Sequence, residues 1–232
     1  MHWSDAAALI VFLLCWVGYE SVRKALAGRR SRMCISEDMY PVREAWLREF
    51  LRRDNRLMDV NLLGHLLNSA SFFASTNLLL IAAAAGVLFG GEAMRQSLHA
   101  LEIAAPAQGW LMEGKIALVT LTLARGLLDF IWAIRQLNYS LAVMGAAPSH
   151  DAPEKHAAFA AAAADVMHPS FATFNRGVRA YYFALAAAAW IVSPWAMAAS
   201  VAFAVFLLLR RQMRSQAARG VYAARLLTEA DI

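Results

Sequence analysis

The chain has 232 residues, of which 60% are hydrophobic and 17% are charged, and its mean hydropathy is +0.45. These values exclude an ordinary soluble domain, because one water-soluble core cannot bury several apolar runs of about 20 residues each. The formal net charge of +5 does not indicate a nucleic-acid partner, since most basic residues flank apolar runs, which is typical of membrane topology. The composition predicts one integral membrane domain over residues 1–232 with an all-α fold, whose expected partner is the lipid bilayer.

The first predicted span covers residues 6–22. A cleaved signal peptide is the alternative, because the small residues at 25–27 follow this run and resemble a cleavage site. However, no Lys or Arg precedes the run, whereas Arg23 and Lys24 come directly after it. This pattern favours a retained span with its N-terminus outside.

A cytoplasmic amphipathic helix is predicted over about residues 41–58. Asp38 followed by Pro41 indicates a helix start, and apolar side chains recur at helical spacing opposite a row of arginines. On the inner leaflet these arginines attract anionic lipid by about 1 kcal/mol each. Alternatively, the helix packs on the protein's own cytoplasmic face. The apolar stripe consists of Val42, Trp46, Leu47, Phe50 and Leu51, and the arginines opposite it are Arg43, Arg48 and Arg52.

The distribution of basic residues predicts the orientation of the chain. Residues 23–56 are rich in arginine, whereas residues 91–115 carry only two basic residues. By the positive-inside rule the first segment is cytoplasmic and the second is external. The second and third spans are therefore placed at about residues 66–90 and 111–135.

The second span combines a ridge of small residues with a polar face. Ala82, Gly86 and Gly90 recur every four residues, and such a ridge lets helix backbones approach closely. Packing between helices is the first interpretation, and a polar path for permeation is the alternative. The polar side chains recur every three or four residues, which places them on one helix face. They are Asn61, His65, Asn68, Ser69, Ser75 and Thr76.

The third span carries two charges near the bilayer centre. Arg125 lies roughly 15 Å from either end of this span, and Asp129 follows on the same helix face. Because an isolated charge at this depth costs about 2.5 to 3.5 kcal/mol, the two side chains are expected to pair. The pair would serve a proton or ion relay or bind a charged ligand. Alternatively, it would only fix the rotation of the helix, or the helix would leave the membrane early, near Asp129. Arg135 marks where the helix leaves the lipid.

Residues 144–176 are predicted to form a cytoplasmic loop. Gly145, Pro148 and Pro153 indicate irregular structure at its start. The alanine-rich stretch that follows predicts a short helix that stops near Pro169.

The last apolar stretch, residues 180–209, decides the predicted number of crossings. As one helix it would be about 45 Å long, which exceeds a hydrocarbon core of about 30 Å. Ser193-Pro194 lies near its middle and proline interrupts helices, so we expect a hairpin of two spans at 177–193 and 194–210. A hairpin also returns the terminal arginines to the cytoplasm, which favours five crossings over four.

The sequence contains no recognisable catalytic or metal-binding motif. The histidines lack paired-ligand spacing such as HExxH, and Cys15 and Cys34 stand in unrelated settings. No Gly-rich phosphate loop or GxSxG turn is present. No catalytic residue, cofactor or metal ion is therefore expected, and the sequence leans away from an enzyme.

Three segments stand out, and RQLNY in the second and YYF in the third are unusual at the ends of membrane spans. They are RDNRLMDVNLLGHLLNSASFFASTNLLL, then IWAIRQLNY followed by GAAP, and finally NRGVRAYYFALAAAAWIVSPWA with LLLRRQMRSQA. In this order they resemble a bacterial family of multi-pass membrane proteins, domain of unknown function 599. The resemblance implies an integral inner-membrane protein and supplies no catalytic residue, cofactor or substrate.

The resemblance also carries over a set of polar residues at the ends of the spans, which form a further candidate site. On the predicted topology they lie at the cytoplasmic ends of their helices, and we expect one cluster there. The candidate cluster consists of Asp54, Asn55, Arg56, Asp59, Arg135, Gln136, Asn138, Tyr139, Asn175, Arg176 and Arg179.

The leading functional hypothesis is an inner-membrane protein that acts by binding, as the scaffold of a homo-oligomer or as the partner of another membrane protein. Its predicted N-terminus is periplasmic and its C-terminus cytoplasmic. A small transporter or channel that uses Arg125, Asp129 and the polar stripe of the second span is the alternative. An enzyme acting on lipid at the inner leaflet is a third reading, which rests only on the polar cluster.

Overall fold

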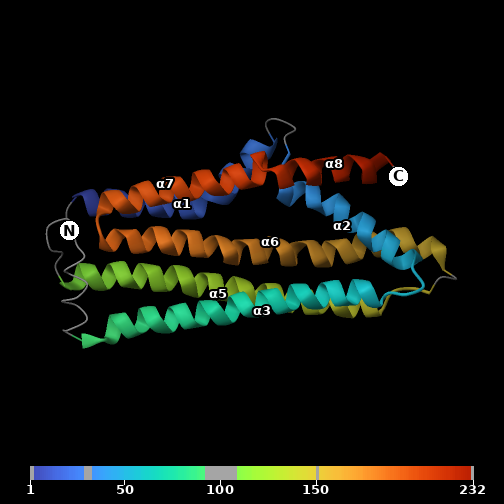
Figure 1. Ribbon diagram of the computed structural model, residues 1–232, viewed down its shortest axis with the longest axis horizontal. Helices are drawn as coiled ribbons and strands as arrows, with labels where there is room; N and C mark the ends of the chain where they lie inside the picture. Colours follow the sequence, from blue (N-terminus) through green and yellow to red (C-terminus); the bar gives the residue numbers. More distant parts are fainter. Residues whose placement is uncertain (1–2, 29–32, 92–108, 150–151, 231–232) are drawn as a thin grey trace. The chain divides into compact units, whose positions relative to one another are not determined.

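The computed structural model describes residues 3–28, 33–91, 109–149 and 152–230 (Figure 1). Every regular element within these residues is a helix, which confirms the predicted all-α fold. In chain order the helices are α1 (Trp3–Gly28), α2 (Ile35–Arg52), α3 (Leu57–Phe89), α5 (Gly109–Gly145), the 3-10 helix η1 (Pro153–Lys155), α6 (His156–Ala188), the 3-10 helix η2 (Ala189–Ile191), α7 (Pro194–Arg214) and α8 (Gln216–Ala230).

Four helical segments among the described residues are long and apolar enough to cross a membrane. They are Trp3–Gly28, Leu57–Phe89, Trp110–Gly145 and Pro194–Glu229. The 33-residue helix α6 is not one of them, because its continuous apolar part begins only after Arg179. Length and composition therefore define a membrane protein.

The contacts divide the chain into two compact units. Unit 1 comprises Met1–Arg30, Ser75–Leu128 and Gly177–Leu209, and unit 2 comprises Ser31–Ala74, Asp129–Arg176 and Arg210–Ile232. Helices α3, α5 and α6 contribute residues to both units. Each unit has its own apolar core.

The core of unit 1 joins α1, α5, α6 and α7. Phe12 of α1 meets Phe183 of α6 edge to face, with ring centroids 5.9 Å apart, and both side chains are fully buried. The buried side chains of Met197 and Val201 bring α7 into the same cluster. In lipid such contacts stabilise the unit by van der Waals packing between helices, because the surrounding acyl chains are as apolar as the side chains themselves.

Two contacts near the N-terminus of α1 also belong to unit 1. Trp3 packs edge to face on Trp195, with centroids 6.3 Å apart. The indole nitrogen of Trp190 donates a hydrogen bond of 3.0 Å to Oδ1 of Asp5, which buries this carboxylate with a partner. The start of α1 therefore lies beside the segment that connects α6 to α7.

The chain reverses where Ser193-Pro194 predicts a break. Helix α6 gives way to η2, and α7 then begins at Pro194 and folds back along α6 (Figure 1). Pro194 occupies the first helical position, where its missing N–H costs nothing, and Ser193 caps the helix by accepting the N–H of Ala196 at 3.0 Å. Local sequence signals thus account for this turn.

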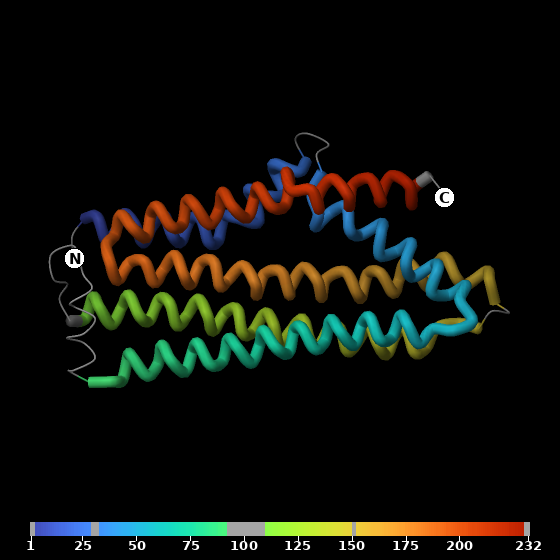
Figure 2. Tube along the Cα trace, in the orientation of Figure 1, coloured from blue at the N-terminus to red at the C-terminus, as the bar shows by residue number. Residues whose placement is uncertain are grey.

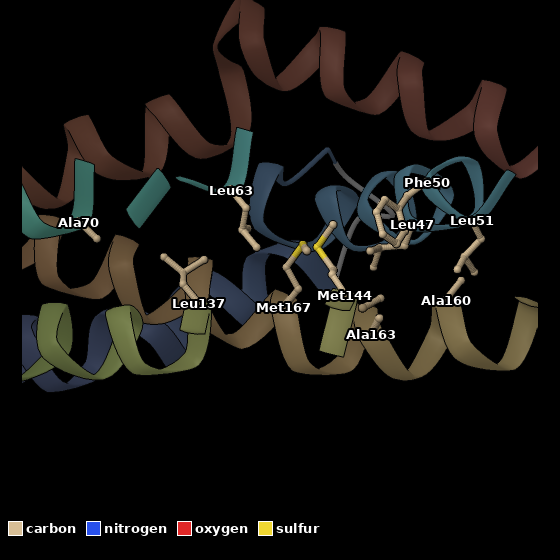
Figure 3. Close-up of a cluster of buried hydrophobic side chains, with 11 residues drawn as sticks. Leu47, Phe50, Leu51, Leu63, Ala70, Leu137, Met144, Ala160, Ala163 and Met167 are labelled. Atoms are coloured by element: carbon tan, nitrogen blue, oxygen red, sulfur yellow. The ribbon is translucent and has the colours of Figure 1, made fainter. Parts of the chain in front are cut away.

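The core of unit 2 joins α2, α3, α5 and α6 (Figure 3). Leu47, Phe50 and Leu51 come from α2, and alanines of α6 face them. Because alanine is small, the neighbouring helices can lie close to α6. Met144 of α5 and Met167 of α6 lie side by side in the same cluster (Figure 3).

Helix α2 begins six residues before the expected start at residue 41. Cys34 is its N-cap, and the carboxylate of Asp38 accepts the backbone N–H of Cys34 at 2.8 Å. This side chain satisfies an end group of the helix, so Pro41 falls inside α2 rather than starting it. The helix ends at Arg52, whereas residue 58 was expected, because the backbone of Arg53 is extended. The next helix, α3, begins at Leu57.

Within residues 144–176, where a cytoplasmic loop with a short alanine-rich helix is predicted, the helix is present, but the prediction that it stops near Pro169 is wrong. Helix α6 begins at His156 and continues through Pro169 to Ala188 as one helix (Figures 1 and 2). Alanine has the highest helix propensity, and the buried Ala160, Ala163 and Ala164 add core packing. These contributions outweigh the loss of one backbone hydrogen bond at the proline.

A glycine permits a close helix crossing in unit 1. A Cβ atom at Gly126 of α5 would lie 2.7 Å from Cβ of Ala180 and 3.1 Å from Nδ2 of Asn77. The side chain of Asn77 is fully buried and donates from Nδ2 to the carbonyl oxygen of Leu123 at 2.9 Å. Glycine is therefore required at this crossing of α3, α5 and α6.

Candidate functional site

The predicted polar cluster begins at the corner between α2 and α3. Asp59 is completely buried, and its Oδ1 accepts hydrogen bonds from Nε1 of Trp46 and Nη1 of Arg53, each 2.6 Å long. Its other oxygen, Oδ2, has no hydrogen-bond partner among the described residues. A carboxylate in the first turn of a helix is also favoured by the helix dipole. Asp59 therefore holds the corner together.

Two further cluster residues stabilise the same corner. Oδ1 of Asn55 accepts the backbone N–H of Leu57 at 3.0 Å, as is typical of an Asx turn before a helix. Nη2 of Arg56 donates to the carbonyl oxygens of Leu51 and Pro148, at 3.3 Å each. These bonds position the backbone, and Asp54 beside them is exposed.

The charged residues of α5 and α6 meet in unit 2. Nε of Arg176 lies 3.1 Å from Oδ1 of Asp129, and Nη2 of Arg176 donates to the hydroxyl of Thr173. Asp129 is buried, whereas Arg125, one helical turn earlier, is exposed. The carboxylate therefore takes an interhelical partner that sequence spacing did not reveal, and a pairing of Arg125 with Asp129 stays a prediction.

Arg179 belongs to unit 1, whereas the other members of the predicted cluster belong to unit 2. Its Nη1 lies 3.2 Å from Oε2 of Glu20, and its guanidinium stacks 4.7 Å from the ring centroid of Tyr19. Within unit 2, Gln136 buries an Oε1 that has no partner among the described residues. The remaining members are exposed, namely Arg135, Asn138, Tyr139 and Asn175.

The polar stripe of α3 faces outward instead of packing against the other helices. Ser69 donates only to the carbonyl oxygen of His65 in its own helix, at 2.9 Å. A Cβ atom at Gly86 would meet no other atom within 4 Å, so the ridge of small residues is also uncovered there. Asn61, His65, Asn68, Ser69 and Ser75 are exposed, and Thr76 is half-buried.

An apolar pocket in unit 2 was not anticipated from the sequence. It has a volume of about 280 Å³ and is partly open to the outside. Phe73 and Phe174 meet edge to face on its wall, with centroids 5.5 Å apart. The hydroxyls of the lining residues Ser69 and Ser170 already donate to backbone carbonyls of their own helices. The lining consists of Leu66, Ser69, Phe73, Leu137, Ser170, Phe171 and Phe174.

A buried arginine lies next to this pocket. Arg43 of α2 is only 7% exposed, and its guanidinium lies 4.0 Å from the ring centroid of Phe171, a residue of the pocket wall. Its Nη1 is 2.9 Å from Nδ1 of His168, and its Nε has no hydrogen-bond partner among the described residues. Burial lowers the pKa of Arg43 to about 10, so the group remains charged at neutral pH.

The position of Arg43 corrects the predicted faces of α2. The sequence pattern predicts Arg43 on the polar face opposite Leu47 and Phe50, but all three side chains are buried. Arg43, Leu47 and Phe50 are four and three residues apart, which places them on one helix face. This spacing is the sequence signal that could have indicated the burial of Arg43. Glu44, the next residue in sequence, pairs with Arg48, and Asp165 of α6 accepts a hydrogen bond from Tyr40.

These features belong to an all-α membrane protein with a polar outer face on α3 and an apolar pocket beside a buried cation. No group of three or more His, Cys, Asp or Glu side chains in the described ranges is arranged to hold a metal ion. The family described as "Protein of unknown function, DUF599" matches residues 7–217, so the chain belongs to this family and the resemblance is confirmed. No curated protein and no solved structure matches the chain.

Proposed function

We propose that the chain acts by binding and forms a homo-oligomer in the membrane along the outward polar face of α3. The observation that carries this proposal is the exposure of Asn61, His65, Asn68 and Ser75 on a helix that is apolar enough to span a bilayer. Such groups lack hydrogen-bond partners in lipid, so another protein surface covers them at lower free energy.

A second copy of the same face is the partner that best complements this stripe. Amide, imidazole and hydroxyl groups both donate and accept hydrogen bonds, so the stripe is complementary to itself across a twofold axis. Interhelical hydrogen bonds in membranes contribute about 0.6 to 2 kcal/mol each. The uncovered Gly86 would let the two backbones approach closely.

The proposed location is the bacterial inner membrane, with a periplasmic N-terminus and a cytoplasmic C-terminus. The arginine-rich segment between residues 23 and 56 supports this orientation by the positive-inside rule. The reversal before Pro194 supports five crossings, in which α6 crosses in addition to the four long apolar segments. In this topology the exposed arginines of α2, such as Arg52, lie within reach of anionic lipid.

Transport through one copy has less support from the geometry. The stripe on α3 lies on the outside of the chain, and Asp129 is already paired with Arg176. A polar path would instead need groups that face a shared interior.

Subunit counting by single-molecule photobleaching, in liposomes over a range of protein densities, tests the proposal. We expect the double substitution Asn61→Leu with Asn68→Leu to raise the density needed for half-dimerisation by about tenfold, which corresponds to about 1.4 kcal/mol. The matched control is Asn138→Leu with Asn175→Leu, which changes two exposed asparagines on α5 and α6. A wild-type chain that stays monomeric at every density would contradict the proposal.

A further inference from the structure

The pocket of unit 2 is a poor site for water. Its volume of about 280 Å³ equals that of roughly nine water molecules at ~30 Å³ each. A buried water needs two to four polar partners, and the lining offers only Ser69 and Ser170, whose protons are already donated. An apolar group is therefore the favoured occupant.

The chemistry of the wall also restricts the shape of this occupant. Phe73 and Phe174 present aromatic surfaces, and Leu66 and Leu137 present aliphatic ones. The pocket is partly open, so a chain can enter it while the rest of the molecule stays outside. Part of a flexible hydrocarbon chain meets both conditions.

The buried guanidinium of Arg43 indicates what the other end of the occupant carries. No carboxylate in the described part of the chain pairs with it, and His168 can only accept at Nδ1 as a neutral ring. A buried charge without a counter-ion is unfavourable, and an anionic oxygen is its natural partner. Phe171 connects the two features, because its ring contacts the guanidinium and also lines the pocket.

We propose that unit 2 binds one anionic phospholipid, with part of an acyl chain in the pocket and the phosphate group at Arg43. This site differs from the lipid contacts expected of exposed arginines, because the pocket lies between α3, α5 and α6 and Arg43 is buried on the core side of α2. It shares only Ser69 with the exposed stripe of α3, so Arg43→Gln tests the lipid site without changing the surface proposed for self-association.

Native mass spectrometry of the full chain in detergent tests the site. The probes are phosphatidylglycerol and phosphatidylcholine with identical oleoyl chains, and free oleate. We expect wild-type protein to retain one phosphatidylglycerol per chain and to prefer it over phosphatidylcholine by about tenfold, because the choline cation of phosphatidylcholine offsets the phosphate charge that Arg43 would pair with.

Two variants test the acyl-chain contact and the head-group contact separately. Ser69→Phe fills the pocket from a residue whose hydroxyl bonds only within its own helix, so it should abolish retention of both phospholipids. Arg43→Gln should remove the preference for phosphatidylglycerol and leave weak binding of both lipids.

Matched controls exclude general effects of size and charge. Ser71→Phe adds the same ring at an exposed position of α3 outside the pocket, and Arg52→Gln removes an exposed arginine of α2. Both controls should bind like wild type. The proposal would be overturned if wild type retains the two phospholipids equally or if Ser69→Phe binds them as well as wild type does. It would also be overturned if oleate binds saturably while phosphatidylglycerol does not bind.

Discussion

Arg225 donates a hydrogen bond of 2.8 Å from Nη1 to Oδ1 of Asp38 and so joins α8 to the start of α2 across 187 sequence positions. The second oxygen of this carboxylate accepts the backbone N–H of Cys34 at 2.8 Å. Asp38 is nearly inaccessible, at 2% exposure, and therefore both caps α2 and holds α8 in unit 2.

Replacing Asp38 by Asn should lower the free energy of unfolding by about 2 kcal/mol. The substitution removes the negative charge from one hydrogen bond to a guanidinium and one to a helix end, and charge-assisted bonds contribute about 1.5–3 kcal/mol. Thermal unfolding in detergent measures the loss. If Arg225→Gln loses the same stability and the double variant loses no more, the loss is assigned to the Asp38–Arg225 pair. As a control, Arg219→Gln on the exposed side of α8 should unfold like wild type.

Gly126→Ala should destabilise the protein by about 1–3 kcal/mol, which is the usual cost of overpacking. The new methyl group would lie 2.7 Å from Cβ of Ala180, and two helix backbones would have to separate. Gly86→Ala provides a control of opposite sign, because no atom lies within 4 Å and alanine favours a helix by about 0.5–1 kcal/mol over glycine. Denaturation in mixed micelles should rank Gly86→Ala above wild type and Gly126→Ala below it. The reverse order would contradict the close crossing.

Asp129→Asn should cost about 1–2 kcal/mol of unfolding free energy, since it weakens the bond from Arg176 and leaves that charge without its carboxylate. The expected loss is at the low end of the range for charge-assisted hydrogen bonds, because the side chain of Arg176 is 46% exposed and partly solvated. Asp54→Asn changes an exposed carboxylate and should have little effect. Chemical denaturation measures the free energy of unfolding of both variants. Equal stabilities would indicate that the interhelical pair contributes nothing.

The phenol of Tyr40 should titrate well above the ordinary range. Its hydrogen bond of 2.7 Å to Oδ1 of Asp165 raises the pKa of Tyr40 to about 12. The folded value exceeds the unfolded value of about 10, so the contribution of Tyr40 to stability is complete below pH 10 and is lost between about pH 10 and 12.

Ultraviolet absorbance of tyrosinate can follow this titration. The difference between wild type and Tyr40→Phe isolates the Tyr40 component. Asp165→Asn should move that component toward pH 10, because the carboxylate that disfavours the ionised phenol is gone. A Tyr40 component that already titrates near pH 10 in the wild type would rule out the hydrogen bond.

Local signals in the sequence were sufficient for the main helices and for the turn before Pro194. Long apolar runs define helices in lipid, and Ser193 with Pro194 supplies both a cap and a first helical residue. Pro169 misled the prediction because core packing of the neighbouring alanines, which is not visible locally, outweighs one missing hydrogen bond.

The candidate sites were harder to predict because their partners lie far apart in the chain. Arg43 carries a charge and was therefore assigned to a polar face, yet His168 and Phe171, both on α6, surround it. Asp129 has its partner 47 residues away on α6, and sequence spacing suggests only neighbours on its own helix. Tertiary contacts of this kind follow from helix docking and not from periodicity.

The aromatic contact of Trp3 with Trp195 predicts the result of thiol labelling from one side of the membrane. Because these rings touch, the amino end of α1 and the first residues of α7 must sit at the same depth and on the same leaflet. Thiols introduced by Ser4→Cys and by Ser193→Cys should then react with an impermeant reagent added from one side only, and from the same side. One such experiment would tell which way α1, α6 and α7 are threaded through the bilayer.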